Sequence, residues 1–293
     1  MMRDLERIGF STEPLIRTGR SPVEKRFKEL EPPLVMGILN VTPDSFSDGG
    51  SFDDLERAVE RALEMVDEGA DIIDVGGEST RPFAEPVSRE EELGRVMPVI
   101  ERLVDRIDVP ISVDTRHVEI AKAALDSGAS LVNDVNGFRE PGMEELLRDS
   151  GASGIIMHMK GTPGDMQVAP SYGSVIDEIH DFLAGRVSHL CEIGVERSRL
   201  IIDPGIGFGK RVEDNLEILR ELGRFRDIGC PILIGTSRKS FIGHVLDLDV
   251  EERLEGSLSS AIVAFQNGAS ILRVHDVKET KRALRMVDSI QRK

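Results

Sequence analysis

Eight short apolar runs, each ending in polar residues, recur along the chain at intervals that leave room for one helix. They cover residues 34–41, 71–77, 110–115, 130–135, 154–159, 200–205, 231–237 and 270–276. Continuous apolar runs of this length are typical of strands buried on both faces of a parallel sheet. Amphipathic stretches between them, such as 53–69 and 214–225, predict helices. The pattern therefore predicts an α/β fold, a (β/α)8 TIM barrel, because eight strands of this kind close into a barrel.

A weak internal repeat marks the junctions between predicted helices and strands. It reads EGAD at 68–71, SGAS at 127–130 and 150–153, and NGAS at 267–270. Glycine suits the residue after a helix, which commonly takes a left-handed conformation. The repeat supports a series of βα units. The alternative, an open doubly wound sheet, is disfavoured because no G-x-G-x-x-G follows the first strand.

The length of 293 residues suits one barrel domain. We predict that this domain spans residues 34–293. Residues 1–33 show mixed charge and little periodicity, and Pro32-Pro33 sets an extended approach to the first strand. They are interpreted as an N-terminal extension that could cover the bottom of the barrel.

The net charge is 37 − 53 = −16, which disfavours sequence-independent nucleic-acid binding. An anionic ligand would then need a local cluster of positive side chains. Cys191 and Cys230 have no metal-ligand spacing and fit ordinary packing in a reducing compartment. The chain shows neither a signal peptide nor a run of about 20 apolar residues, so a cytoplasmic protein without a membrane partner is expected.

Polar residues collect at the ends of the predicted strands. In a barrel of this type, the carboxyl ends of the strands build the active site. Any one of these residues could be structural, but the ring as a whole predicts a functional site. Its members are Asn40, Asp74, Asp114, Asn133, His158, Asp203, Ser237, Arg238, Lys239, Arg273 and His275.

Two groups within the ring differ in chemistry. Asp114, Asn133 and Asp203 offer mainly acceptors and suit a flat heterocycle with adjacent N–H donors. Asp203 precedes Pro204-Gly205 and could equally serve a turn. A second group consists of donors, several of them cationic, and suggests a phosphate or diphosphate site. It contains Asn40, Arg81, Arg273 and His275.

Several glycine-rich or loop segments resemble known motifs only in part. The segment 235–243, GTSRKSFIG, lacks the spacing of a phosphate loop, and 205–210, GIGFGK, lacks the order of a dinucleotide fingerprint. The latter is interpreted as a close-approach loop beneath a flat ligand. DSFSDGG at 44–50 does not match an EF-hand. The long connections 42–52 and 78–88 are rich in Gly, Ser, Pro and Asp and are expected to be functional.

Taken together, the segments resemble the dihydropteroate synthase family of the pterin-binding barrel superfamily over about residues 34–290. The most specific are MGILNVTPDSFSDGG (36–50) and GADIIDVGGESTRP (69–82). ISVDT, VNDV, MHMKGTP, IIDPGIGFGK, TSRKSFIG and RVHD follow in family order at strand ends. The resemblance implies a transferase that condenses 6-hydroxymethyl-7,8-dihydropterin diphosphate with p-aminobenzoate, releasing diphosphate and 7,8-dihydropteroate for folate biosynthesis.

The resemblance also assigns residues to roles. Catalytic residues would be Asp74, Asp114 and Lys239, and the pterin would be bound by Asp114, Asn133, Asp203, Phe208 and Lys239. Diphosphate would be held by Asn40, Thr80, Arg81, Arg273 and His275, and p-aminobenzoate by Phe46, Thr80, Pro82 and Ser240. Mg²⁺ would bind Asn40, with Asp44 a further candidate ligand. The negative charges of Asp74 and Asp114 would stabilise a cationic methylene after diphosphate departs.

Further implications of the resemblance are a homodimer and a target for sulfonamides. The chain departs from the usual family pattern at Phe83, Lys160 and Thr236. Phe83 stands where the family usually has glycine, a change expected to alter closure of the second loop or the p-aminobenzoate pocket. The acceptor could be another arylamine than p-aminobenzoate, because loops build most of that pocket. Two other functions are weighed: a pterin-dependent methyltransferase acting on a corrinoid protein, and a non-catalytic pterin-binding barrel. Diphosphate release with p-aminobenzoate present separates the synthase from both.

Overall fold

The parallel barrel predicted from the sequence is confirmed in the computed structural model, which describes residues 33–41, 52–78, 87–162, 164 and 166–291. The strands are β1 Leu34–Asn40, β2 Ile72–Gly76, β3 Ile111–Asp114, β4 Leu131–Asp134, β5 Ser153–Met157, β6 Leu200–Asp203, β7 Leu233–Ile234 and β8 Ile271–Val274. They pair in the order β6-β5-β4-β3-β2-β1-β8-β7. A parallel bridge between Ile202 and Ile232 joins the two ends and closes the barrel. The predicted N-terminal extension lies outside the described residues, apart from Pro33.

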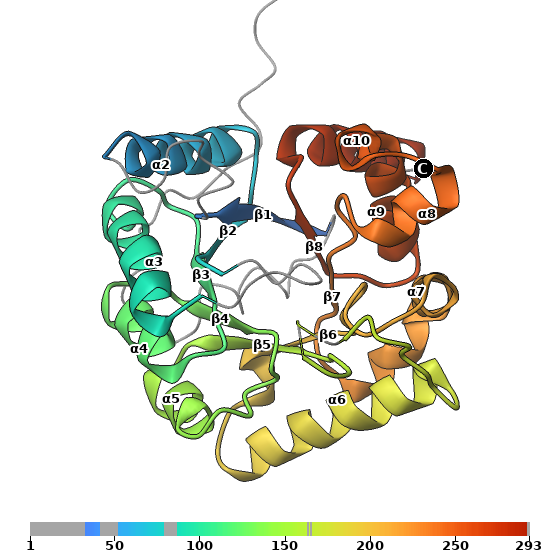
Figure 1. Cartoon of the computed structure of the whole chain (residues 1–293), viewed down its shortest axis with the longest axis horizontal. Helices are drawn as coiled ribbons and strands as arrows, with labels where there is room; N and C mark the ends of the chain where they lie inside the picture. Colours follow the sequence, from blue (N-terminus) through green and yellow to red (C-terminus); the bar gives the residue numbers. More distant parts are fainter. Residues whose placement is uncertain (1–32, 42–51, 79–86, 163, 165, 292–293) are drawn as a thin grey trace, which may run out of the picture.

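Helices surround the strands on the outside of the barrel (Figure 1). They are α2 Phe52–Asp67, α3 Arg89–Leu103, α4 Val118–Asp126, α5 Met143–Ser150, α6 Val175–Glu192, α7 Val212–Arg220, α8 Ser240–Leu246, α9 Leu254–Gln266 and α10 Val277–Gln291. Short 3₁₀ turns occur at η2 Arg197–Arg199, η3 Leu222–Ile228 and η4 Val250–Glu252. Within the described part of the chain, no helix has the length and hydropathy needed to cross a bilayer.

The glycine repeat behaves as predicted. Gly69, Gly128, Gly151 and Gly268 have φ values of 100°, 111°, 76° and 119°, in the region that side chains disfavour. Each stands between a helix and the strand that follows it. The repeat therefore ends one βα unit and starts the next.

The observed strands are shorter than the predicted runs, and two elements depart in ways that have a physical reason. The helix predicted over 214–225 ends at Arg220, and η3 Leu222–Ile228 follows it. In η3 the buried residues are Leu222, Phe225 and Ile228, and a spacing of three matches the three residues per turn of a 3₁₀ helix. The strand predicted over 231–237 has only Leu233 and Ile234, because the chain turns away to present residues 236–239.

The inside of the barrel is built in two layers. The lower layer is an apolar cluster of Leu34, Met36, Ile72, Leu131, Ile155, Ile201, Leu233 and Ile271. Side chains alternate along a strand, so the residue two positions further faces inward again. Those second positions include Asp74, Asn133, Asp203 and Arg273, and Asp114 is paired with Asn133 in the strand register. The register therefore places these five polar residues, which we call the polar floor, directly above the apolar cluster, which we call the apolar plug.

Candidate active site

Arg273 of β8 is the centre of the polar floor. Its Nε donates to Asp74 Oδ2 of β2 at 2.6 Å, and one of its terminal nitrogens donates to Asp114 Oδ2 of β3 at 2.5 Å. Asn133 of β4 donates its amide to the same oxygen of Asp74 at 3.0 Å. Four residues predicted from separate strands thus form one hydrogen-bonded network. The guanidinium that the sequence assigned to diphosphate binding also neutralises two carboxylates.

Burial and charge pairing set the electrostatics of this network. Burial raises the pKa of Asp114 to about 7, although Arg273 acts in the opposite direction. Burial alone would lower the pKa of Arg273, but Asp74 and Asp114 outweigh it and raise this pKa above its ordinary value. Arg273 therefore stays charged at neutral pH, while Asp114 is partly protonated. The three groups together carry at most one net negative charge.

Asp203 and Lys239 lie on the other side of the floor. Asp203 ends β6, and its Oδ1 accepts the Gly205 N–H at 2.7 Å. This bond confirms the turn-forming interpretation, yet Oδ2 makes no hydrogen bond with a described residue. Burial raises the pKa of Asp203, with Lys239 opposing it. One carboxylate oxygen thus shapes the loop and the other is available for a ligand.

Lys239 precedes α8 and reaches back over the barrel. Its ammonium donates to the Ile206 carbonyl and lies 4.7 Å from the centroid of the Phe208 ring. Burial lowers the pKa of Lys239 to about 8, while Asp203 acts to raise it. The nitrogen is therefore mostly protonated at pH 7 and can donate to a carbonyl oxygen.

The turn that presents Lys239 is fixed from several sides. Arg238 has a φ of 58°, a strained value for a residue with a side chain. Its N–H donates to Ser257 Oγ at 2.8 Å, and Arg253 donates to its carbonyl at 3.1 Å. The Arg238 guanidinium also binds Asp276 at 3.0 and 2.5 Å. These bonds hold Arg238 in its strained conformation, so Arg238 supports the turn that positions Lys239.

An apolar wall stands next to the floor. Val135, Met157, Met159 and Met166 form a separate buried cluster, and Phe208 packs against it. Methionine sulfur and aromatic faces both pack well on a flat ring. The wall and the acceptors beside it can accommodate a planar heterocycle with polar edges.

The glycines of the GIGFGK loop, residues 205–210, lie against the backbone of a neighbouring segment. Gly205, Gly207 and Gly209 have φ values of 72°, 82° and 65°. A Cβ on Gly205 or Gly209 would overlap the carbonyl oxygen of His158 or Lys160, respectively. Glycine is required here because this loop lies against the chain leaving β5. The contact with the backbone explains the glycines of this loop, which the sequence analysis had interpreted as a close approach beneath a flat ligand.

Lys210, at the end of that loop, was missed from the sequence. It is only 2% exposed, and its ammonium lies 3.0 Å from His158 Nδ1. It also donates to the carbonyls of Phe208 at 3.0 Å and His158 at 3.3 Å. Burial lowers the pKa of Lys210 to about 7 and that of His158 to about 3. The imidazole is therefore neutral and accepts from Lys210. A lysine after G-x-G gives no sequence signal that it will be buried.

Replacing Lys210 by methionine is expected to destabilise the fold by about 1–3 kcal/mol at pH 7, because the acceptors of His158 and Phe208 lose their donor. The folded-state pKa lies below the unfolded value, so the unfolded chain binds more protons between about pH 7 and 10. Wild-type stability should therefore gain from this group as pH rises through that window. Lys210→Met should remove this gain. Urea unfolding from about pH 7 to 10 measures both effects, and an unchanged slope would contradict the assignment.

The predicted diphosphate residues lie on neighbouring strands at the rim. Asn40 ends β1 and is partly exposed, and β1 pairs with β8. His275 follows β8, and its Nδ1 lies 3.0 Å from Ser237 Oγ. Asn40 and His275 are thus at the same edge of the barrel as the Arg273 guanidinium.

Other predicted positions fall on segments outside the described residues. These are Asp44, Phe46, Thr80, Arg81, Pro82 and Phe83. Ser240 is the first residue of α8 and is exposed, beside Lys239. The unusual Lys160 donates to the Ser171 carbonyl at 2.5 Å and to Glu178 at 3.1 Å, so it links the segment after β5 to α6. Thr236 is buried, and nothing in the structure explains this departure.

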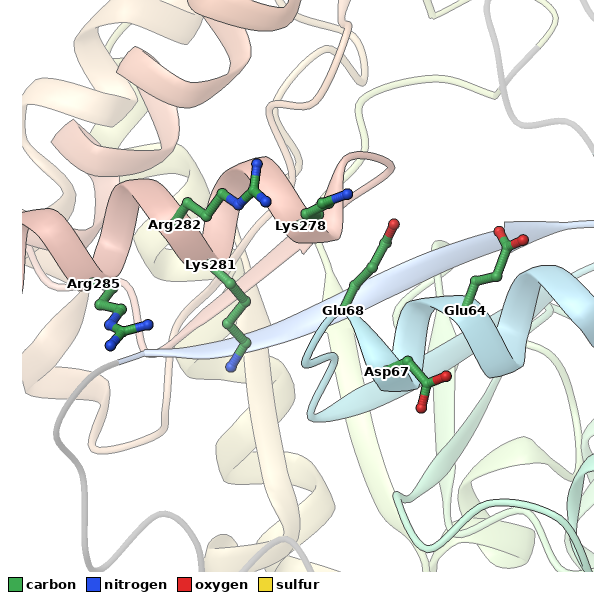
Figure 2. Close-up of a pocket in the computed structure, with 7 residues that line it drawn as sticks. All are labelled: Glu64, Asp67, Glu68, Lys278, Lys281, Arg282 and Arg285. Atoms are coloured by element: carbon green, nitrogen blue, oxygen red, sulfur yellow. The ribbon is translucent and has the colours of Figure 1, made fainter. Parts of the chain in front are cut away.

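A cavity of about 520 Å³ lies away from the floor, between α2 and α10. Figure 2 shows this groove lined by acidic side chains of α2 and the adjoining Glu68 on one side and by basic side chains of α10 on the other. Its residues are Glu64, Asp67, Glu68, Lys278, Lys281, Arg282 and Arg285. Lys281 is paired with Asp71 at 2.5 Å, and Glu68 with Arg61 at 3.3 Å. Each of these pairs joins a lining residue to a neighbour outside the lining set, so this is a groove of mixed charge on the outside of the barrel.

Comparison with known proteins identifies the family. A family model described as pterin binding enzyme matches residues 36–275. Dihydropteroate synthase of Escherichia coli K12 is 47% identical over 261 residues, covering 89% of this chain and 93% of the relative. A structure of the Xanthomonas albilineans synthase with 4-aminobenzoic acid superposes with a TM-score of 0.84 at 46% identity, covering 89% and 94% of the two chains. The same synthase in complex with 7,8-dihydropteroate gives 0.82 at 44% identity, with the same coverage. The chain therefore belongs to the pterin-binding enzymes and, within them, to the dihydropteroate synthase family.

Proposed function

We propose that the strand-end site joins 6-hydroxymethyl-7,8-dihydropterin diphosphate to p-aminobenzoate, forming 7,8-dihydropteroate and diphosphate. The observation that carries this proposal is the pairing of an available Asp203 oxygen with a donating Lys239 beside Phe208 and the methionine wall. A dihydropterin is a planar ring with a carbonyl oxygen adjacent to N–H donors. The site offers complementary groups for each part.

Asp203 Oδ2 would accept from the pterin amino and ring N–H groups. Lys239 would donate to the pterin carbonyl, and Asn133 and Asp114 would contact the remaining polar edge. Asp74 Oδ1 is also buried and has no hydrogen-bond partner among the described residues. A buried acceptor without a donor destabilises a protein by about 1–3 kcal/mol. A ligand that supplies donors would remove part of that cost.

The diphosphate would lie at the rim between β1 and β8. Arg273 donates from two of its three nitrogens to Asp74 and Asp114, and its third nitrogen would donate to the diphosphate. Asn40 and His275 would add donors there, with Thr80 and Arg81 as sequence-based candidates. Mg²⁺ fits this set, because it prefers oxygen ligands and commonly combines one or two protein oxygens with substrate phosphates. The Asn40 side-chain oxygen would hold it, and Mg²⁺ would neutralise charge on the leaving diphosphate.

The reaction then follows from charge and position. The carbon–oxygen bond to diphosphate breaks, and its electron pair leaves with the diphosphate. The electron-rich dihydropterin stabilises the resulting cationic methylene, and the residual negative charge of Asp74 and Asp114 favours it. The arylamine nitrogen supplies the electron pair of the new carbon–nitrogen bond and loses its proton. Because an aromatic ammonium is acidic, no strong base is required.

The p-aminobenzoate would bind at the mouth, near Ser240 and the sequence-predicted Phe46, Thr80 and Pro82. A sulfonamide has the same aromatic amine and a similar anionic end, so we propose that sulfonamides compete there. Purified chain, Mg²⁺, pterin diphosphate and p-aminobenzoate should yield diphosphate and dihydropteroate in equal amounts. Added sulfonamide should raise KM for p-aminobenzoate without changing kcat. Pterin binding without diphosphate release would overturn the proposed function.

We also propose a homodimer in a reducing cytoplasm. Several exposed apolar side chains lie on α7, α8, η4 and α9, of which α7, α8 and α9 contact one another, and burying them against a second copy would remove them from water. They are Leu216, Val245, Leu246, Val250 and Val263. Cys191 and Cys230 carry free thiols, which suits a reducing compartment. Sedimentation velocity would test the dimer, and a mass near that of a single chain would contradict it.

A further inference from the structure

We propose that Glu78, Glu92 and His117 form a second cation site, selective for a divalent transition ion such as Zn²⁺, outside the pterin floor. One ligand atom from each residue lies within 4.8 Å of the other two. Glu78 follows β2, His117 follows β3, and Glu92 comes from α3. The site lies at the same end of the barrel as Asp74 and Asp114 but on the side facing α3.

Glu92 is the residue that points to a missing partner. It is 1% exposed, both of its carboxylate oxygens are buried, and apart from the nearby Thr115 hydroxyl they have no hydrogen-bond donor among the described residues. Burial raises the pKa of Glu92, with Thr115 and His117 acting in the opposite direction. A buried carboxylate needs a compensating charge or donor. A cation between Glu92 and its neighbours would supply that charge.

His117 is oriented as a metal ligand. Its Nδ1 lies 3.0 Å from Glu140 Oε2, and Glu140 is fixed by the Val118 N–H at 3.1 Å and by Arg89 at 3.4 Å. A carboxylate on Nδ1 holds the proton there and leaves the lone pair on Nε2. Nε2 faces Glu92 Oε2 at 3.9 Å. The same carboxylate–histidine arrangement orients histidines that ligate metals in proteins.

Glu78, which follows β2, is the third proposed ligand. Arg116 donates to its two oxygens at 3.2 and 3.0 Å, which fixes the carboxylate without using all of its lone pairs. Gly77 brings α3 close, because a Cβ there would lie 3.1 Å from Glu92 Cγ. The three ligands are therefore held by separate elements that already pack tightly.

The donor set selects the ion class. One imidazole and two carboxylates suit Zn²⁺ and similar transition ions better than Mg²⁺ or Ca²⁺, which prefer oxygen alone. In a tetrahedral site with bonds of about 2.1 Å, neighbouring ligand atoms are roughly 3.4 Å apart, so the side chains would need to move together by about 1 Å. The bound ion would cross-link the ends of β2 and β3 to α3, which stabilises the rim without contacting the substrate.

The competing explanation is a proton instead of a metal ion. A protonated Glu92 beside His117 would also relieve the buried charge, and Zn²⁺ would then find no site. The full chain should be freed of metals with a chelator and titrated calorimetrically with Zn²⁺ alone at about pH 7.5, because metal ions bind imidazole and carboxylate ligands in their deprotonated forms. We expect one site that Glu92→Gln weakens by roughly 100-fold or more, because a ligand is lost. His117→Gln should act similarly, and Glu140→Gln should weaken binding by about 10–100-fold.

Matched variants make the result decisive. Glu90→Gln removes an exposed carboxylate from the same helix and should leave Zn²⁺ binding unchanged. Asn40→Ala alters the proposed Mg²⁺ site and should also leave Zn²⁺ binding unchanged. The Zn²⁺ titration therefore tests this inference independently of the proposed function. Glu92→Gln conserves shape, and circular dichroism checks its fold. Absence of a Zn²⁺ site in the wild type, or equal affinity in Glu92→Gln, would overturn the proposal.

Discussion

Replacing Asp203 by alanine is expected to lower kcat/KM for the pterin diphosphate by about 10³-fold, because ligand donors left unpaired in a buried site are costly. The variant removes the oxygen proposed to accept the pterin N–H groups. It also removes the charge that favours the protonated form of Lys239, whose pKa Asp203 acts to raise. Calorimetry with a pterin that lacks phosphates measures the binding loss directly. Unchanged affinity would refute the role of Asp203.

A second substitution separates binding from folding. Asp203 Oδ1 also accepts the Gly205 N–H, so alanine could disturb the loop as well as the ligand site. In Asp203→Asn the new side chain can keep that bond through its carbonyl oxygen, but it directs an amide donor at the pterin. Asp203→Asn should therefore melt near the wild-type temperature and still lose pterin affinity. If only the alanine variant lost affinity, loop geometry and not hydrogen bonding would be the cause.

Replacing Arg273 by alanine is expected to destabilise the protein by about 3–5 kcal/mol and to abolish turnover, because removing one partner leaves buried charges uncompensated. The variant leaves Asp74 and Asp114 without their counter-charge. It also removes a donor proposed for diphosphate. Urea unfolding gives the stability, and a loss below about 1 kcal/mol, typical of exposed pairs, would show that the carboxylates are not effectively buried.

The pH dependence of the Arg273 variant has a definite sign. The folded pKa of Asp114 is already raised to about 7, so the folded state holds this proton more tightly than the unfolded chain. Stability contributed by the group therefore falls as pH rises from about 4 to 7. Without Arg273 the folded pKa rises further, so the loss should be largest near about pH 8 and smallest near about pH 5. Asp114→Asn in the Arg273→Ala background should recover part of the stability.

Much of the fold, and the inward-facing strand residues of the site, can be predicted from local sequence patterns. Strand positions are visible because buried strands are continuous apolar runs, and the glycine repeat marks the starts of four of them, β2, β4, β5 and β8. The inward position of Asp74, Asn133 and Asp203 follows from the two-residue period of each strand. The bounds of short elements are harder to predict: β7, predicted over 231–237, spans only Leu233–Ile234, because its ends depend on neighbouring strands and not on composition.

The remaining site features depend on pairs far apart in the sequence. Arg273 pairs with Asp74 across 199 residues, and no local signal distinguishes a guanidinium free for diphosphate from one already bound to carboxylates. Lys210 and His158 are 52 residues apart, and burial of both is visible only in three dimensions. Loop residues such as Thr80 and Arg81 remain predictions from the family resemblance.

The shared guanidinium of Arg273 also constrains how such a site can evolve. Asp74 and Asp114 both depend on the same cation, so a substitution at any one of the three positions changes the charge balance at the other two. Mutational effects at these positions are then strongly epistatic. A change of ligand at this site would then require substitutions at Asp74, Asp114 and Arg273 together, or would pass through a less stable variant. The apolar plug beneath can drift independently, because it shares none of those charges.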